Sequence, residues 1–374
     1  MHRKPVYVLA SGGTGGHVFP AISLAQELYG SQRHVYLFTD SRGKNFPKTQ
    51  CLDGVTTFKL HKGHGLLGRL FLYLSVVWQT IRCCFLYRTL KPTVVVGFGG
   101  YPSVPPVWAA QIMGIPTVLH EQNAVLGKAN RFLARRAYRV ATSFPETRFL
   151  TQAFQQTGNP VRPQILALQK STYASFKDND PFVLFVFGGS QGAAIFSEVV
   201  PKALTSLPLE FQRRLKVYQQ CRPEYLSQTR ALYRESFIDV TLEPFFEDVA
   251  ALYEQAHLII SRSGASTVAE LAVAGKPAIL VPYGASREGD QHYNALWYAD
   301  EKAAWMIREE EFTLENLKKH LTLLMNDEAI LKNTAYAMRK LAIPKASRNL
   351  AHVVTQVIGD VLTENDTCAH FINS

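Results

Sequence analysis

The chain has 374 residues, a formal net charge of +10 and a hydrophobic fraction of 47%, so it is long enough for two domains that each bury a core. The positive charge favours an anionic partner, such as phospholipid, nucleic acid or a phosphorylated substrate. Five cysteines without a C-x-x-C spacing argue against a disulfide framework or a zinc site, and no apolar export signal opens the chain, so we expect a reducing cytoplasm.

The first predicted element is a buried strand at residues 6–10, followed by the turn GGTGGH at 12–17 and a helix over 18–29. This order places free backbone N–H groups and a helix N-terminus where a phosphate can bind. The same order recurs in FVLFVFGGSQGA at 182–193, which predicts two α/β halves. The glycine spacing fits the dinucleotide pattern G-x-G-x-x-G poorly, and no P-loop sequence occurs.

Further apolar runs predict that the first half is a parallel sheet covered on both faces. They lie at residues 35–38, 55–60, 94–98, 117–120 and 139–141. Residues 66–88 differ, because aliphatic and aromatic side chains there alternate with Arg69, Arg82 and Arg88. The longest uncharged run, 70–81, has 12 residues, fewer than the ~20 that span a bilayer. We therefore expect either a core helix or an amphipathic helix that rests on anionic lipid.

A polar cluster of His120, Glu121, Gln122 and Asn123 follows a predicted strand. Ligands bind at strand ends in open α/β sheets, so the cluster is a candidate site. Alternatively, Asn123 caps a helix that begins near Ala124. The linker-like sequence QQTGNPVR then marks a domain boundary.

The second half continues the alternation of strands and helices. Strands are predicted at 182–187, 215–219, 238–241 and 257–260, and helices at 191–206, 223–234, 246–255, 313–339 in two pieces and 346–361, before a polar tail. A small-residue turn at 263–267 precedes Glu270, which we expect on the first turn of the next helix, where it could complete a capping box with Thr267. The D-x-D sequence Asp178-Asn179-Asp180 precedes a strand within a polar run, so a solvated turn is expected there and no metal site is required.

Five motifs occur in order along the chain. They are GGTGGH at 12–17, HEQNA at 120–124, GNPVR at 158–162, GGSQGA at 188–193 and SRSGASTVAE at 261–270. Together they closely resemble the MurG family of bacterial N-acetylglucosamine transferases, which convert lipid I into lipid II in peptidoglycan synthesis. The resemblance implies a GT-B architecture, with two Rossmann-like parallel-sheet domains facing across a cleft. Residues 1–161 plus 345–374 would form the acceptor and membrane-side domain, and residues 162–344 the UDP-sugar-binding domain.

The resemblance also implies the reaction and its partners. N-acetylglucosamine would pass from UDP-N-acetylglucosamine to the C4 hydroxyl of the N-acetylmuramyl unit of lipid I, undecaprenyl-pyrophosphoryl-N-acetylmuramyl-pentapeptide. The transfer would be inverting and metal-independent, without a cofactor, and would serve cell-wall biogenesis, cell shape and division. The enzyme would lie peripherally on anionic phospholipids at the cytoplasmic side of the inner membrane, and no nucleic-acid partner is expected.

The motifs carry over a set of substrate-binding residues. The resemblance places Thr14, Gly15 and Gly16 beside the donor sugar and phosphates, and Asn123 at the N-acetylglucosamine. It places Arg162 and Ser190 by the diphosphate, Phe246 at uracil through its backbone, and Gln291 at the sugar. The residues around phosphate and ribose would be Ala265, Ser266, Thr267, Val268, Ala269 and Glu270. Glu270 would accept from the ribose hydroxyls.

His17 is the leading candidate for the general base. It closes a glycine-rich turn at a helix start, and histidine ordinarily titrates near ~6.5, which suits proton removal at neutral pH. Alternatively, His17 positions the acceptor hydroxyl, binds the donor phosphates or orients the turn. His120, Glu121 and the acidic residues of the first domain's loops are then the reserve candidates for the base.

Two other functions fit parts of the sequence. A UDP-N-acetylglucosamine epimerase could share the fold, since fold does not decide chemistry. A nucleic-acid binder would explain the charge, but the basic residues are spread along the chain rather than gathered in a stripe with stacking aromatics.

Overall fold

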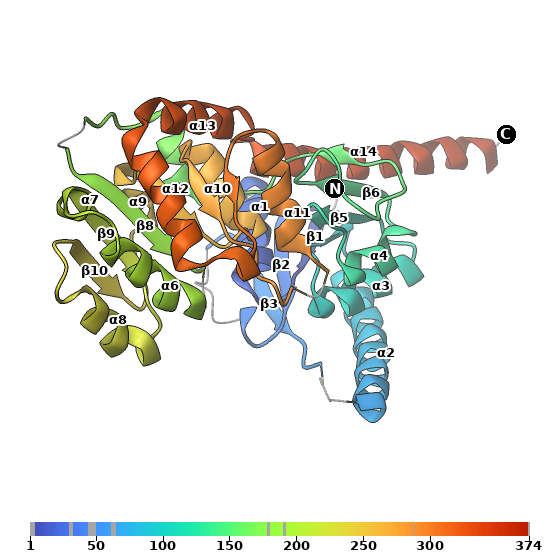
Figure 1. Ribbon diagram of the computed structural model, residues 1–374. Helices are drawn as coiled ribbons and strands as arrows, with labels where there is room; N and C mark the ends of the chain where they lie inside the picture. The colour runs from blue at the N-terminus through green and yellow to red at the C-terminus, as the bar shows by residue number, and fades with distance from the viewer. Residues whose placement is uncertain are drawn as a thin grey trace. The chain divides into compact units, whose positions relative to one another are not determined.

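The computed structural model describes residues 4–29, 33–43, 50–60, 65–177, 180–189, 192–286 and 288–372. The chain divides into two compact units, unit 1 with residues 1–161 and 345–374, and unit 2 with residues 162–344. Each unit is built on one parallel sheet flanked by helices (Figure 1). The predicted fold class of two α/β parallel-sheet halves is therefore confirmed.

The sheet of unit 1 has the strand order β3-β2-β1-β4-β5-β6-β7, with all neighbours parallel. Its strands are β1 (Val6–Ala10), β2 (His34–Thr39), β3 (Gly54–Thr57), β4 (Val94–Gly97), β5 (Thr117–Glu121), β6 (Arg139–Thr142) and β7 (Gln155–Gln156). Its helices are α1 (Gly15–Leu28), α2 (Gly65–Leu90), α3 (Val104–Ile112), α4 (Lys128–Ala134) and α14 (Ala346–Ile372), with a 3-10 turn at Tyr101–Ser103.

The core of unit 1 forms on both faces of this sheet. Because side chains alternate along a strand, Tyr7 and Leu9 of β1 pack in one cluster with residues of α1 and α14, including Leu350. Val8 and Ala10 of the same strand pack in a second cluster with α2, α3 and α4. The apolar run of β1 therefore reflects burial on both sides, as expected for a central parallel strand.

The sheet of unit 2 has the order β10-β9-β8-β11-β12-β13, again with all neighbours parallel. Its strands are β8 (Phe182–Phe187), β9 (Leu215–Gln220), β10 (Asp239–Glu243), β11 (Leu258–Ser261), β12 (Ala278–Leu280) and β13 (Trp305–Met306). Its helices are α5 (Pro163–Leu166), α6 (Ala194–Thr205), α7 (Leu209–Arg214), α8 (Leu226–Tyr233), α9 (Val249–Gln255), α10 (Ala265–Ala274), α11 (Asp290–Asp300), α12 (Leu314–Asn326) and α13 (Glu328–Lys340), with 3-10 turns at Ala167–Lys170, Pro223–Tyr225 and Glu309–Glu311.

Both sheets reverse their strand order at one point, between β1 and β4 in unit 1 and between β8 and β11 in unit 2. In open α/β sheets, ligands bind beyond the carboxyl ends of the strands at such a switch point. The two predicted glycine-rich turns follow β1 and β8, the small-residue turn follows β11, and a further glycine pair, Gly99-Gly100, follows β4. The fold therefore places these motifs where a ligand is expected in each unit.

Several local predictions are wrong. The helix expected from Ala124 begins at Lys128 with Gly127 as its N-cap, so Asn123 caps no helix. Helix α10 begins at Ala265 with Gly264 as N-cap, which puts Glu270 on its second turn and excludes the capping box. The last helix does not end at residue 361 before a polar tail, because α14 continues to Ile372.

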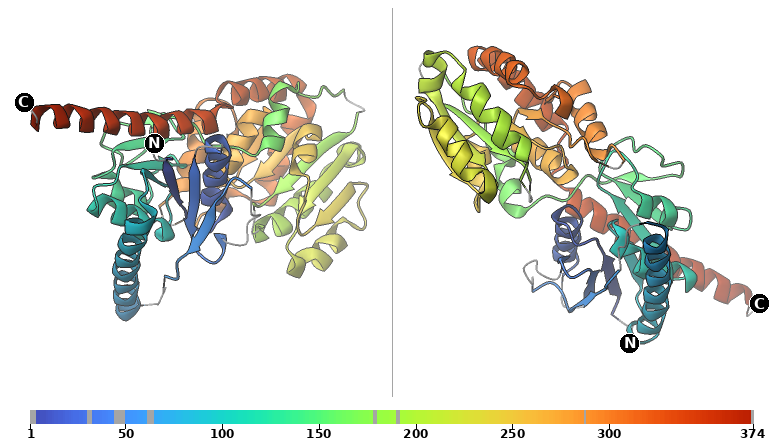
Figure 2. Two further views of the ribbon diagram at one scale, coloured as in Figure 1. Left: turned by 180° about the vertical axis from the view of Figure 1, so that it is seen from behind. Right: turned by 60° about the horizontal axis from the view of Figure 1, so that its bottom comes forward.

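Helix α2 covers the sequence at 66–88 and extends beyond the sheet of unit 1 (Figure 2). Cys83 and Tyr87 are buried, and the Tyr87 hydroxyl donates to the Pro106 carbonyl of α3 at 3.0 Å. Most of its large apolar side chains are instead exposed, among them Phe71 (60%) and Trp78 (66%). The core-helix interpretation therefore holds only for the side of α2 that carries Cys83 and Tyr87, and it is wrong for the rest of the helix.

Within the described part of the chain, one segment, Leu70–Leu90, is long and apolar enough to cross a membrane by length and composition alone. The run of 12 uncharged residues therefore does not by itself exclude a span. The buried contacts of Tyr87 tie the end of this segment to α3.

Candidate active site

The switch point of unit 1 is built around the ring of His17. The turn after β1 meets the turn after β4, where Gly12 N donates to Gly99 O at 2.9 Å. A Cβ atom on Gly12 would lie 2.9 Å from His17 Cδ2, and one on Gly100 would lie 3.3 Å from the same atom. Only glycine leaves room for the ring at these positions. Packing against His17 therefore explains why glycine occurs in both turns.

A chain of hydrogen bonds runs from His17 into unit 1. His17 Nδ1 lies 3.2 Å from Gln122 Oε1, Gln122 Nε2 lies 3.1 Å from His120 Nδ1, and His120 Nε2 lies 3.0 Å from Gly158 O. His120 is fully buried, and this burial lowers its pKa to about 4. Three motifs that are distant in sequence therefore meet in one network of unit 1.

Glu121 organises the loop after β5. Its carboxylate accepts from the backbone N–H groups of Asn123 and Gly127 and from the side chains of Asn123 and Asn130, at 2.9 to 3.2 Å. Glu121 is 2% exposed, and burial raises its pKa. Glu121 and His120 are both buried and hydrogen-bonded, so they are less accessible to a substrate hydroxyl than the half-buried His17.

The other predicted residues of unit 1 lie at the surface of the same region. Thr14 is the N-cap of α1, and its side chain makes no cap hydrogen bond. Thr14 and Gly16 are exposed, while Gly15, His17 and Asn123 are half-buried. His17 thus combines an accessible ring with a buried network behind it.

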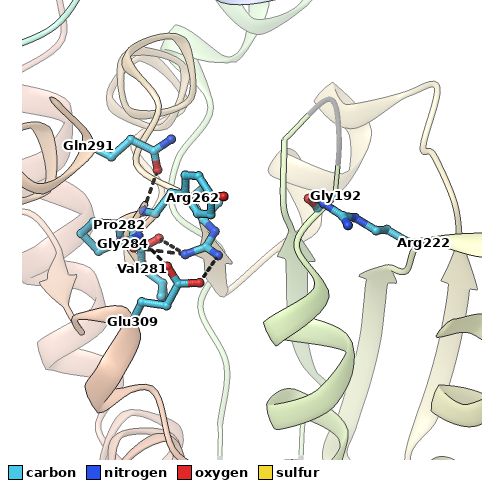
Figure 3. A network of polar contacts seen from close by, with 9 residues as sticks. Gly192, Arg222, Arg262, Val281, Pro282, Gly284, Gln291 and Glu309 are labelled. Carbon is cyan, nitrogen blue, oxygen red and sulfur yellow. Dashed lines mark hydrogen bonds and ion pairs between the residues drawn. The ribbon is translucent and has the colours of Figure 1, made fainter. Parts of the chain in front are cut away.

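The switch point of unit 2 begins with the turn after β8. A Cβ atom on Gly188 would lie 2.3 Å from Ala193 N, so this tight return of the chain requires glycine. Arg222, which follows β9, lies across the turn and donates to Gly192 O at 3.2 Å (Figure 3). Ser190, predicted at the diphosphate, lies outside the described residues.

Arg162 and Glu270 meet in unit 2. Two hydrogen bonds join them, from Arg162 Nε to Glu270 Oε1 at 2.7 Å and from Nη2 to Oε2 at 2.8 Å. Burial raises the pKa of Glu270, and the bonds from Arg162 oppose that rise. The same bonds raise the pKa of Arg162, and their two parallel contacts are the geometry of a guanidinium–carboxylate ion pair.

The turn between β11 and α10 is fixed to α11. Ser263 Oγ donates to the Gln291 carbonyl at 2.8 Å, and Asn294 Nδ2 donates to Ser263 O at 3.0 Å. Gly264, the N-cap of α10, has no side chain to satisfy the N–H groups of the first turn. This turn therefore presents backbone N–H groups that no cap side chain binds, together with the positive end of a ten-residue helix.

A second ion pair holds the loop after β12. Arg262 donates to the carbonyls of Val281 and Pro282 at 3.2 and 3.1 Å and to Glu309 Oε1 at 2.7 Å. Figure 3 shows Gln291 reaching the same loop, where its Oε1 accepts from the N–H of Tyr283 at 3.0 Å while its amide nitrogen points away. Arg262 and Gln291 thus fix the loop from two sides.

Phe246 lies in the loop between β10 and α9, not at the start of a helix as predicted. Its ring packs edge-on against Phe185, with centroids 5.7 Å apart, and lies 6.4 Å from Tyr218. The ring of Phe246 therefore packs against β8 and β9, while the residue as a whole stays half-buried.

Sequence reasoning missed several residues of these networks. It gave Gln122 no role of its own and did not name Arg222, Arg262 or Glu309. A basic residue two or three positions after the end of a predicted strand was an available signal for Arg222 and Arg262. No local pattern identified Glu309, because it approaches Arg262 from a distant segment.

Two further features bear on ligands. Within the described ranges, no group of three or more His, Cys, Asp or Glu side chains could hold a metal ion.

A cavity of about 580 Å³ is lined by Lys4, Val6, His34, Leu90 and neighbours. Its lining also includes Tyr36 and Phe38 of β2 and Leu86 of α2, so this cavity runs along one face of the sheet beside α2.

Comparison with known proteins gives a consistent result over the whole chain. Residues 7–142 match the glycosyltransferase family 28 N-terminal domain, and residues 183–350 match its C-terminal domain. A Zymomonas mobilis protein named UDP-N-acetylglucosamine–N-acetylmuramyl-(pentapeptide) pyrophosphoryl-undecaprenol N-acetylglucosamine transferase is 42% identical over 372 residues, covering 98% of this chain and 96% of the relative.

Solved structures agree with this relationship. The crystal structure of Acinetobacter baumannii MurG is similar with a TM-score of 0.78 at 30% identity, covering 94% of this chain and 99% of that one. A UDP-N-acetylglucosamine 2-epimerase from Listeria monocytogenes, with a TM-score of 0.64, 13% identity and coverage of 93% and 94%, shares the fold alone. The chain is therefore a GT-B glycosyltransferase that belongs to family 28 and, within it, to the MurG family of N-acetylglucosamine transferases.

Proposed function

We propose that this enzyme transfers N-acetylglucosamine from UDP-N-acetylglucosamine to the C4 hydroxyl of the N-acetylmuramyl unit of lipid I, with inversion, and so forms lipid II. The observation that carries the proposal is the 42% identity over nearly the full length to a relative named for this donor and acceptor. The epimerase alternative has only a fold-level likeness in its support.

In this proposal unit 2, residues 162–344, binds the donor. The N–H groups on the first turn of α10 and the positive end of that helix favour a diphosphate. Ser266 and Thr267 lie on this turn, and the Ser266 hydroxyl is buried without a hydrogen-bond partner in the described structure. Arg162 and Ser190 contribute at the diphosphate, Glu270 at the ribose, the Phe246 backbone at uracil and Gln291 at the sugar.

Unit 1, residues 1–161 plus 345–374, receives the acceptor in this proposal. His17 removes the proton of the C4 hydroxyl, whose oxygen attacks the anomeric carbon as the bond to the diphosphate breaks. The departing UDP carries the electron pair and the negative charge, which helix N-termini, backbone N–H groups and Arg162 stabilise. Thr14, Gly15, Gly16 and Asn123 border the donor sugar.

We further propose that unit 1 rests on anionic phospholipid at the cytoplasmic side of the inner membrane. Exposed aromatic and aliphatic side chains of α2 support an interfacial position. Arginines stand among them, with Arg88 5.2 Å from the ring centre of Phe85. The buried Tyr87 contact favours a helix that lies on the membrane over one that crosses it.

The test follows radiolabelled UDP-N-acetylglucosamine incubated with a short-chain lipid I analogue. Label is expected in the lipid fraction as a β-1,4-linked disaccharide. A parallel incubation without acceptor separates the alternative, because an epimerase converts the UDP-sugar alone. No lipid-linked product, together with an epimerised UDP-sugar, would overturn the proposal.

A further inference from the structure

We propose that Gln122 and His120 are positioning residues that hold neutral His17 in the tautomer protonated on Nδ1, so that Nε2 carries the lone pair that removes the acceptor's proton. This inference rests on the proposed function, in which His17 is the base. It follows from the direction of each hydrogen bond in the network behind the ring.

The far end of the network fixes the tautomer of His120. The Gly158 carbonyl can only accept, so His120 Nε2, at 3.0 Å, carries a proton and donates it. His120 is neutral at physiological pH, because burial lowers its pKa to about 4. Its Nδ1 therefore bears a lone pair and accepts from Gln122 Nε2 at 3.1 Å.

The orientation of the Gln122 amide follows from a second carbonyl. Gln122 Nε2 also lies 3.2 Å from the His120 carbonyl oxygen, which excludes the flipped amide because two oxygens would then face each other. The amide oxygen Oε1 consequently faces His17 Nδ1 at 3.2 Å. Since this oxygen can only accept, Nδ1 must hold the proton, and the lone pair of neutral His17 lies on Nε2.

Glycines pack against the His17 ring. Gly99 and Gly100 have φ values of +80° and +77°, which favour glycine, and their Cα atoms leave space beside the His17 ring. The titratable neighbours of His17 in this network are His120 and Glu121. Because the Glu121 oxygens accept from the loop after β5, a neutral amide and not a carboxylate is the partner of Nδ1.

The tautomer can be measured on the full chain without turnover. In protein labelled with 15N-histidine, the imidazole nitrogen shifts at pH 8 distinguish a protonated from an unprotonated Nδ1, and His17→Ala assigns the signals. We expect Nδ1–H for His17 in the wild type. Gln122→Met is expected to move His17 to the Nε2–H tautomer, which a histidine without a partner on Nδ1 prefers. In Gln122→Glu one oxygen still accepts from His17 Nδ1, and the second oxygen, when protonated, can donate to His120 Nδ1 in place of the amide nitrogen, so this variant should retain Nδ1–H.

Gln111→Leu is the matched control, because Gln111 is a half-buried amide of unit 1 that donates to Leu133 O at 2.8 Å, away from His17. It should leave the His17 tautomer unchanged. For Gln122→Met we expect kcat to fall by roughly 10²-fold with unchanged donor affinity, as for loss of a group that orients a catalytic histidine. The fall in kcat should be smaller for Gln122→Glu.

An Nε2–H tautomer in wild-type His17 would overturn the assignment, and so would a switched tautomer in Gln122→Met with unchanged kcat. Where Gln122→Met does not fold, loss of Nδ1–H in Gln122→Glu would overturn it as well. A wild type that transfers no sugar refutes the proposed function instead, while the nitrogen shifts still decide the tautomer.

Discussion

Arg162 and Glu270 face each other through two parallel hydrogen bonds of 2.7 and 2.8 Å that join the N-cap of α5 to the second turn of α10. Each carboxylate oxygen has a further lone pair, so Glu270 can accept a ribose hydroxyl while it remains bound to Arg162. One pair can therefore serve both the stability of unit 2 and the proposed binding of the donor.

The stability of this pair can be tested by a double-mutant cycle. Arg162→Met should lower the free energy of unfolding by roughly 1–3 kcal/mol, because it leaves the Glu270 charge buried without its partner. This loss is smaller than for a fully buried ion pair, since the Arg162 side chain is 31% exposed. Urea unfolding of Arg162→Met, Glu270→Leu and the double variant measures the coupling. Additive losses would show that the pair contributes nothing of its own.

Donor affinity tests the second role of the same carboxylate. Glu270→Ala should weaken UDP-N-acetylglucosamine binding by roughly 1.5–3 kcal/mol, the range for a hydrogen bond to a charged group. Isothermal titration calorimetry measures the change, with Arg162→Met as the comparison. If donor affinity is unchanged in folded Glu270→Ala, Glu270 acts in stability alone.

His17→Ala should cut turnover by roughly 10²–10⁴-fold, the usual range for the loss of a general base. Donor affinity should change little, because a base acts on the acceptor hydroxyl. His34→Ala is the control, since His34 begins β2 at the opposite edge of the same sheet and pairs with Asp53 at 3.0 Å. Loss of donor binding in proportion to activity would assign His17 to the phosphates.

Transfer is expected to survive EDTA. The described residues offer no group of three metal-ligating side chains, and backbone N–H groups with Arg162 can stabilise the leaving diphosphate. The assay compares initial rates before and after chelation. A rate abolished by EDTA and restored by magnesium or manganese contradicts this expectation.

Helix α2 should bind anionic vesicles in a salt-dependent way, because attraction between surface charges is screened over about 10 Å at roughly 0.1 M salt. Phe71→Ser and Trp78→Ser should reduce co-sedimentation. Leu209→Ser and Phe237→Ser are matched controls on exposed positions of unit 2 (54% and 56%). Release by detergent alone, and not by salt or alkaline carbonate, would indicate a spanning helix instead.

The stability of the fold should fall in mild acid because of His257. Its Nδ1 accepts from the N–H of Val183 at 2.9 Å, and burial lowers its pKa to about 4 from an ordinary 6.5. Between these values the unfolded chain binds a proton that the folded chain does not, so the free energy of unfolding decreases as pH falls from 6.5 to 4, by up to about 3 kcal/mol. His257→Asn keeps an acceptor for Val183 and should flatten this slope in urea titrations; an equal slope in wild type and variant contradicts the assignment.

The sequence predicted most strands because their signal is local. A buried parallel strand such as β1 must be apolar on both faces, and a glycine turn that follows it has few other interpretations. Helix starts were predicted less well, because Asn123 satisfies the sequence preference of an N-cap while its side chain binds Glu121 instead.

The network behind His17 could not be predicted from local patterns. Its members come from α1, from β5 and the residues that follow it, and from the sequence before Arg162, and only the tertiary fold brings them together. The same holds for Arg262 and Glu309, whose bond of 2.7 Å joins residues 47 positions apart. The order of the motifs identified the family, but the directions of the hydrogen bonds in this network follow only from the three-dimensional structure.

The discontinuity of unit 1 has a consequence for biosynthesis. Leu350, Val353, Val354 and Val357 of α14 belong to the same buried cluster as Tyr7 and Leu9 of β1. A ribosome releases these residues only after all of unit 2 has been translated. The core around β1, the first strand to be synthesised, therefore cannot be completed until α14, the last helix, has been made. Unit 2 is continuous in sequence and can complete its core earlier. The order of maturation along the nascent chain is therefore reversed for these two units, with the amino-terminal one finishing last.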